Sequence, residues 1–257
     1  MVDLMDFGIP VLFVFGAIVG SFLNVCIHRI PKGESLWKPR SHCPLCELPI
    51  SPRHNIPILS FFILKGRCAR CQGKISVAYP LVELISGLVA VGTYGFHGFN
   101  LTAAVEFLLL CLLLVISVID LNLKTIPDVL TLPGIVLSVA LSPFLPSKTV
   151  VQSVLGIVVG GGMLWCVAWV YEKVTGVEGM GGGDVKLLSL IGGVLGWWQV
   201  PVVLFVASLS GSVYGLFLML RLGVGTKHAL PFGPFLCAAT VLLLFFSGVG
   251  LRWPLWE

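Results

Sequence analysis

The stretch VEFLLLCLLLVISVIDLNLKTIPD, residues 105–128, decides what kind of fold this chain adopts. Its first part is a run of leucine, isoleucine and valine that ends at Asp120. A helix needs about 20 apolar residues to cross the hydrocarbon core of a bilayer, and the apolar run over 101–119 is close to that length. An ionisable residue at the end of such a span is a candidate functional residue, because it is costly to keep there.

The composition of the whole chain agrees with a membrane fold. Of its 257 residues, 57% are hydrophobic and only 11% are charged, and the mean hydropathy is +1.01. A soluble globular domain carries about 25% charged residues. We therefore expect an all-α polytopic membrane protein whose solvent is the lipid bilayer.

Eight apolar spans, and so about eight transmembrane helices, are expected along the chain. They cover residues 10–27, 79–97, 101–119, 127–145, 150–171, 185–197, 199–221 and 230–249. The sixth is short for a crossing, so it is tilted, buried among other helices or fused with the seventh across Gly196–Pro201, which leaves seven or eight. No cleavable signal peptide is expected, because Asp3 and Asp6 rather than a basic leader precede the first span.

The lysines and arginines predict the orientation. The loop over 28–78 holds nine of the chain's 16, so the positive-inside rule places it in the cytoplasm. With eight crossings and both termini outside, 14 of the 16 fall on the cytoplasmic side. The same assignment of crossings puts Asp120, Asp128 and Asp184 at the cytoplasmic edge of the membrane. The expected parts are a first transmembrane helix over 1–27, a loop domain over 28–78 and a transmembrane core over 79–257.

The cytoplasmic loop carries the spacing of a metal site. It reads CPLC at 43–46 and CARC at 68–71, and 21 residues separate the two knuckles. Four thiolates in this pattern can hold one tetrahedral zinc ion, and a closed four-sulfur shell is structural rather than catalytic. A reducing cytoplasm disfavours disulfides, and the alternative is four free or transiently oxidised thiols. We expect zinc on Cys43, Cys46, Cys68 and Cys71, stapling a loop that is too small for a large core.

A second acid with unusual surroundings is Asp184, in GMGGGDVK at 179–186. Its expected depth matches that of Asp120. Two carboxylates held close together cannot both stay ionised, so one activates water while the protonated partner polarises a peptide carbonyl. The alternative is that each acid faces water or a lysine, Lys124 or Lys186. The glycines permit positive φ and close approach of a peptide, or else they form a flexible linker or a small-residue helix contact.

Seven short motifs, taken in order, resemble one known family over nearly the whole chain. One of the seven is the pair of cysteine knuckles. The other six are GSFLNVCIHRIP at 20–31, NIPILS at 55–60, YPLVEL at 79–84, DLNLKTIPDVLTLP at 120–133, GMGGGDVKLL at 179–188 and PFGPFL at 231–236. The chain is similar to the type IV prepilin peptidases, which are leader peptidases and N-methyltransferases of pilus and type II secretion systems. One departure is Ala78, where many members carry arginine before the YP pair.

The resemblance implies roles for individual residues. Asp120 and Asp184 match the two catalytic aspartates, and Asp184 lies in the GxGD motif that also resembles presenilin-type proteases. Asp128, Gly181, Gly183 and Lys186 look like supporting residues of that aspartyl protease core. The four loop cysteines match the family's metal-binding cysteines, which implies structural Zn²⁺.

The resemblance also implies substrates and a second activity. Prepilins and pseudopilins would be cut after a basic leader, at a Gly–Phe bond, at the cytoplasmic face of the bacterial inner membrane. The new N-terminal residue would then be methylated with S-adenosylmethionine. The 28–78 loop is the only sizeable polar region, so cofactor contacts are expected there. The candidates are Asn24, Arg29, Glu34 and Glu83.

Two other functions stay open from the sequence. The first is a peptidase without methyltransferase activity. The second is a transporter or metal-handling protein, whose site would lie near the bilayer midplane rather than at its edge, where the two aspartates are expected. The bilayer and the pilin substrates are the expected partners, and no nucleic-acid partner is expected.

Overall fold

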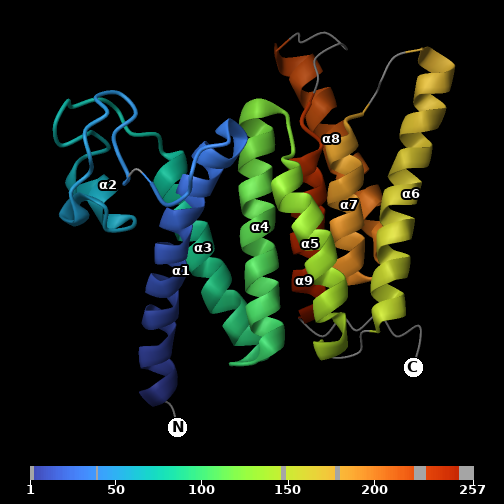
Figure 1. The fold of residues 1–257 in the computed structure, drawn as a ribbon, viewed down its shortest axis with the longest axis horizontal. Helices are drawn as coiled ribbons and strands as arrows, with labels where there is room; N and C mark the ends of the chain where they lie inside the picture. The colour runs from blue at the N-terminus through green and yellow to red at the C-terminus, as the bar shows by residue number, and fades with distance from the viewer. Residues whose placement is uncertain (1–2, 39, 146–148, 177–179, 223–229, 249–257) are drawn as a thin grey trace. The chain divides into compact units, whose positions relative to one another are not determined.

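A computed structural model describes residues 3–38, 40–145, 149–176, 180–222 and 230–248 of the protein (Figure 1). In these ranges the chain forms α-helices, short 3-10 turns and two isolated β-bridges, and no strand. The helices are α1 Asp3–Arg29, α2 Leu59–Ile63, α3 Ala78–His97, α4 Leu101–Leu123, α5 Asp128–Leu141, α6 Val150–Thr175, α7 Gly182–Leu195, α8 Val200–Leu222 and α9 Gly233–Gly248. The 3-10 turns are Ile30–Lys32, Pro52–His54 and Ser142–Phe144.

The expected all-α membrane fold is confirmed. Each of the eight apolar stretches coincides with a helix, namely α1 and α3 to α9. Five helices among the described residues, α1, α3, α4, α6 and α8, are long and apolar enough to cross a membrane. The helices α5 and α9 are apolar but shorter. The chain is therefore a multi-pass membrane protein.

The sixth expected span, α7, is short because it is buried among other helices. Four of its large apolar residues are at most 1% exposed: Leu187, Leu188, Leu190 and Ile191. A helix that is hydrophobic all round lies in a protein interior. It is not fused with the next span, because α7 ends at Leu195 and Gly196 then adopts a φ of +95°, which breaks the helix.

The chain forms two compact units, Met1–Val115 and Ile116–Glu257, and their boundary falls within α4. In the first unit, α1 and α3 lie side by side (Figure 1). Their contact depends on glycine: a Cβ at Gly16 would lie 2.5 Å from the carbonyl oxygen of Ser86, and one at Gly20 would lie 2.7 Å from the Cα of Glu83. The polar loop with the four cysteines connects these two helices.

In the second unit, α7 packs between α5 and α6 (Figure 1). The backbones of α6 and α7 approach so closely that a Cβ on Gly156 would clash with the carbonyl of Gly192, and a Cβ on Gly192 with that of Gly156. The Ser153 hydroxyl donates a 2.8 Å hydrogen bond to the carbonyl oxygen of Gly193 across the same contact. Small residues that allow close backbone approach are a common means of joining membrane helices.

A pair of glycine substitutions in α6 tests this contact. We expect Gly156→Ala to lower the free energy of unfolding by about 1–3 kcal/mol, because the added methyl group overpacks the contact between α6 and α7. Gly162, on the same helix, has open space around its Cα. Gly162→Ala should be neutral or stabilise by about 0.5–1 kcal/mol through helix propensity. Thermal unfolding of the purified protein in detergent measures both, and equal effects would contradict the packing described.

Candidate active site and metal site

Asp120 lies near the C-terminal end of α4, in the second unit, and is only 4% exposed. Its Oδ2 accepts a 3.0 Å hydrogen bond from the backbone N–H of Gly233, the first residue of α9. The first N–H groups of a helix have no partner within the helix and attract negative charge. A Cβ at position 233 would lie 2.7 Å from this carboxylate oxygen, so only glycine allows the contact.

Asp184 lies in the first turn of α7, and its backbone N–H bonds to the carbonyl of Gly181 at 3.2 Å. The side chain of Ile126 packs against the start of this helix, where a Cβ on Gly183 would stand 2.9 Å from the Ile126 Cβ. The same isoleucine also approaches Gly233, where a Cβ would stand 3.2 Å from its Cδ1. Ile126 therefore holds the starts of α7 and α9 close together.

Of the glycines before Asp184, Gly183 serves close packing, and Gly181 and Gly182 have open space around them. Gly181 is the extended N-cap of α7, with a φ of −73°, and Gly182 and Gly183 are helical. None of these three has a positive φ, contrary to the reason the sequence suggested for them. Gly179 lies outside the described residues.

The structure brings Asp120 and Asp184 together, within electrostatic range of each other. Both carboxyl groups also lie within electrostatic range of Cys237, a buried residue one turn after Gly233. The Cys237 thiol contacts the Ser117 hydroxyl. The pair thus lies at the ends of three helices, beside apolar residues such as Leu236, which is 0% exposed. In such a medium two neighbouring acids share a proton.

Asp128 and Lys186 form an ion pair beside this site. The Lys186 Nζ lies 2.6 and 2.8 Å from the two carboxylate oxygens of Asp128, and both side chains are partly exposed. The pair joins the first residue of α5 to the N-terminal part of α7. Lys186 is therefore bound to Asp128 rather than to Asp184. An exposed pair of this kind contributes about 0–1 kcal/mol to stability, so its main effect is to position the two turns.

The four loop cysteines of the first unit form one cluster. The Sγ atoms of Cys43, Cys46, Cys68 and Cys71 all lie within 4.8 Å of one another, and the Cys43 and Cys71 sulfurs are 3.8 Å apart. A tetrahedron with zinc–sulfur bonds of about 2.3 Å has edges of about 3.8 Å. The backbone N–H groups of Cys71 and Arg70 lower the pKa of the Cys68 thiol to about 6. For Cys71, a backbone hydrogen bond at Gly73 that lowers the pKa is outweighed by burial and by the other three thiols, and its pKa rises to about 11.

The two knuckles are copies of one backbone turn. Each opens with a cysteine whose N–H bonds to the carbonyl five residues later, and each has a positive φ at the fourth residue after that cysteine. An isolated antiparallel bridge flanks each turn. The matching pairs are Cys43 N–H to Leu48 O and Cys68 N–H to Gly73 O, positive φ at Glu47 and Gln72, and bridges His42–Pro49 and Arg67–Lys74. The repeated turn presents two sulfurs from each side to one point.

Three of the four expected cofactor contacts already bind backbone groups of this unit. Asn24 Nδ2 donates to the carbonyl of Tyr79 at 3.1 Å, and Arg29 Nη1 donates to that of Ser35 at 2.9 Å. The Glu83 carboxylate accepts a 2.7 Å hydrogen bond from the N–H of Ile58. Glu34 is exposed. Asn24 and Glu83 lie at the same α1–α3 contact.

Ile58 explains why a buried acid is needed at position 83. Its φ of +62° and ψ of −53° place a β-branched residue in a strained region, within a tight turn in which the N–H of Leu59 bonds to the carbonyl of Pro57 at 2.6 Å. The Glu83 carboxylate holds the N–H of this turn and so attaches the loop to α3.

Sequence reasoning missed Gly233, Ile126 and Cys237 as parts of the aspartate site. The glycine stands in PFGPFL at 231–236, a motif to which the sequence alone assigns no role. Its position beside Asp120, 113 residues away, has no local signal in the sequence. The isoleucine and the cysteine are ordinary apolar residues by composition, and only packing places them here.

Comparisons with known proteins match almost the whole chain. The family described as bacterial peptidase A24 N-terminal domain matches residues 14–96, and the type IV leader peptidase family matches residues 107–216. A prepilin leader peptidase/N-methyltransferase of Aeromonas salmonicida (strain A449) is 38% identical over 274 residues, covering 95% of this chain and 92% of the relative. No solved structure matches.

Two further relatives carry the same name. The one from Burkholderia pseudomallei (strain 1026b) is 35% identical over 259 residues, covering 91% of this chain and 84% of the relative. The one from Pseudomonas aeruginosa is 36% identical over 267 residues, covering 93% of this chain and 92% of the relative. The similarity therefore extends through both compact units and both candidate sites.

Proposed function

The chain belongs to the type IV leader peptidase family, and on that premise we propose that it removes the leader from prepilins and pseudopilins and then methylates the new N-terminus. The single observation that supports the peptidase half is that Asp120, near the end of α4, and Asp184, in the first turn of α7, lie within electrostatic range of each other beside the start of α9. Two acids in one apolar site supply both partners of an acid–base hydrolysis.

We assign the two aspartates different starting states. Asp120 accepts the Gly233 N–H at the start of a helix, and a hydrogen bond to the charged form favours that form. Asp120 is therefore the ionised base that takes a proton from water, and Asp184 is the acid that donates a proton to the scissile carbonyl. The tetrahedral intermediate then breaks to a leader carboxylate and a new α-amine. Such acid–base assistance contributes about 10²–10⁴-fold in rate for each group.

The Asp128–Lys186 pair supports this chemistry from outside the site. It fixes the start of α5 to the N-terminal part of α7, whose first turn carries Asp184. Gly181 and Gly183 act in the same way, since the first caps α7 and the second lets Ile126 approach. These residues position the acid and need not touch the substrate.

For the topology we propose eight crossings of the bacterial inner membrane, with the loop and the two aspartates on the cytoplasmic side. The nine basic residues of the 28–78 loop support this orientation. The leader of a membrane-inserted prepilin would meet the aspartates at that surface.

For the cofactors we propose a structural Zn²⁺ and S-adenosylmethionine. The sulfur spacing of the cysteine cluster and the two matching turns support zinc. S-adenosylmethionine would supply the methyl group to the new α-amine. Asn24, Arg29, Glu34 and Glu83 remain the proposed contacts of the cofactor. Arg29 and Glu83 also bind backbone groups of the loop, and Asn24 joins α1 to α3, so their effect on methylation would come partly through that structure.

The test uses the purified full-length protein in detergent with a prepilin and methyl-labelled S-adenosylmethionine. The expected product is a pilin without its leader whose new N-terminal residue carries the label. A cleaved, unlabelled pilin would leave the peptidase and remove the methyltransferase. An uncleaved prepilin would contradict the proposed function.

A further inference from the structure

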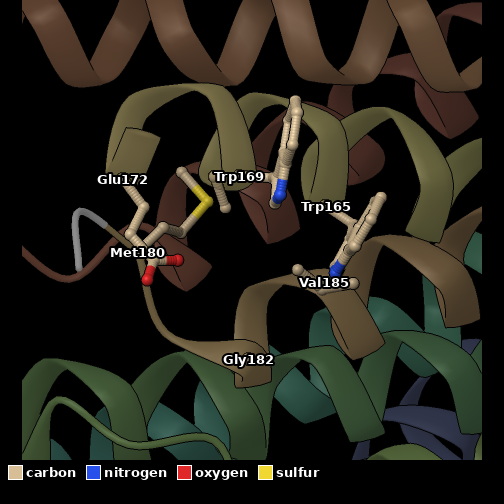
Figure 2. Close-up of a pocket in the computed structure, with 7 residues that line it drawn as sticks. Trp165, Trp169, Glu172, Met180, Gly182 and Val185 are labelled. Atoms are coloured by element: carbon tan, nitrogen blue, oxygen red, sulfur yellow. The ribbon is translucent and has the colours of Figure 1, made fainter. Parts of the chain in front are cut away.

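A pocket lies between the C-terminal part of α6 and the start of α7, next to Asp184 in the sequence (Figure 2). Trp165, Trp169 and Glu172 line it from α6, at the four- and three-residue spacings that place side chains on one helix face. Gly182 and Val185, which flank Asp184, line it from α7. Its volume is about 240 Å³. Small-molecule sites hold about 300–1,000 Å³, so this pocket suits a single long side chain better.

The walls of the pocket suit a cation on an aliphatic stem. The indole rings of Trp165 and Trp169 stack with their centroids 6.5 Å apart, and Figure 2 shows them projecting on the same side as Glu172. The Nζ of Lys173, one turn further along α6, lies 6.0 Å from the centroid of the Trp169 ring, at the outer limit of a cation–π contact. Met180 adds a polarisable thioether.

Glu172 supplies the charge. Within the described part of the chain, no lysine, arginine or histidine forms an ion pair with it. Its carboxylate lies in the pocket beside Met180 in Figure 2. A carboxylate next to two indole faces recognises an ammonium or a guanidinium group by a charge-assisted hydrogen bond and by cation–π attraction.

We propose that this pocket binds a lysine or arginine side chain of the substrate's leader, and this inference rests on the proposed function. Val185, which lines the pocket, directly follows Asp184 in α7. The ends of two side chains one residue apart on a helix of about 10–12 Å diameter lie about 8–9 Å apart. An extended peptide covers that distance in about two to three residues. A basic residue about two to three positions from the scissile bond could therefore enter the pocket while the bond itself lies at Asp184.

The position of the pocket selects the leader side of the bond. Glu172 and Lys173 are adjacent charged residues close to the C-terminal end of α6, after its long apolar body. A cation held there belongs to a part of the substrate that reaches water. The part of a pilin that stays in the bilayer carries no charge at that depth without a large cost.

A cycle of enzyme and substrate variants tests the proposal with the full-length protein in liposomes. The enzymes are wild type and Glu172→Gln, and the substrates are a prepilin with its basic leader and the same prepilin with glutamine at every basic leader position. We expect Glu172→Gln to lower kcat/KM about five- to tenfold on the basic leader and to leave it unchanged on the neutral one. Trp169→Leu should give a smaller loss with the same selectivity.

The neutral substrate is also the control for folding, because a damaged enzyme loses activity on both leaders. Equal losses on both would overturn the proposal and assign Glu172 to the fold or to a cationic lipid headgroup. No loss on either would overturn it too. Rescue of Glu172→Lys by an acidic leader would support it independently. A wild-type enzyme that cleaves neither substrate would contradict the proposed function itself.

Discussion

Replacing Asp184 by asparagine should abolish leader cleavage while leaving the protein folded. Asparagine keeps the shape of the side chain but cannot give or take the proton, so we expect kcat/KM to fall by about 10³-fold or more. Asp120→Asn should cause a similar loss, and the double variant should be little worse than either, because the two acids act as a unit. Cleavage of a purified prepilin, followed by gel shift, measures all three.

The stability of these variants separates a chemical role from a structural one. Two neighbouring acids in an apolar site oppose folding, so replacing either acid by asparagine should leave the unfolding temperature unchanged or raise it. A matched control is Glu106→Gln, which removes another carboxyl group of α4, one that pairs with His97 far along the helix from Asp120. It should keep full cleavage. If Asp184→Asn retained activity, or lost it only by unfolding, the two-aspartate mechanism would be wrong.

Removing the metal should unfold the cysteine loop and reduce methylation more than cleavage. Structural zinc contributes about 10–16 kcal/mol to small metal-bound folds, and this loop has little other core. We expect Cys46→Ser, or a strong chelator, to increase amide hydrogen exchange over 40–75 and to lower methylation at least about tenfold. Cleavage should fall much less, because Asp120 and Asp184 lie in the other compact unit.

The control for that experiment is Cys166→Ser, which changes an exposed cysteine of α6 outside the cluster. It should alter neither metal content nor methylation. Zinc content is measured by elemental analysis of the purified protein. Equal losses of cleavage and methylation on metal removal would contradict the division of labour between the loop and the aspartates.

Much of the fold was predictable because the bilayer imposes simple rules. Spans of apolar residues must be helical in lipid, so the positions of α1 and α3 to α9 followed from the sequence. The cysteine cluster followed from the spacing of its ligands. Each knuckle brings two sulfurs to one turn, so two knuckles supply the four ligands of one site.

Other parts depended on contacts between distant residues. The burial of α7 results from close contacts at glycines on both of its sides, such as Gly156 of α6 against Gly192. A count of apolar residues does not show which helix will be central. The bond from Gly233 to Asp120 joins residues 113 apart. Glu83 was expected to contact a cofactor, but its hydrogen bond to the strained Ile58 appears only when the loop is folded. These arrangements come from tertiary packing rather than from local preference.

The central claim is that Asp120 and Asp184 cut the leader from a prepilin whose N-terminus this protein then methylates. The most direct measurement is the intact mass of a prepilin co-expressed with the wild type, beside the same prepilin co-expressed with Asp184→Asn. The account predicts a product without its leader and with one added methyl group from the wild type, and a full-length, unmethylated prepilin from the variant. A processed pilin from the Asp184→Asn strain, or an intact prepilin beside the folded wild type, would contradict it.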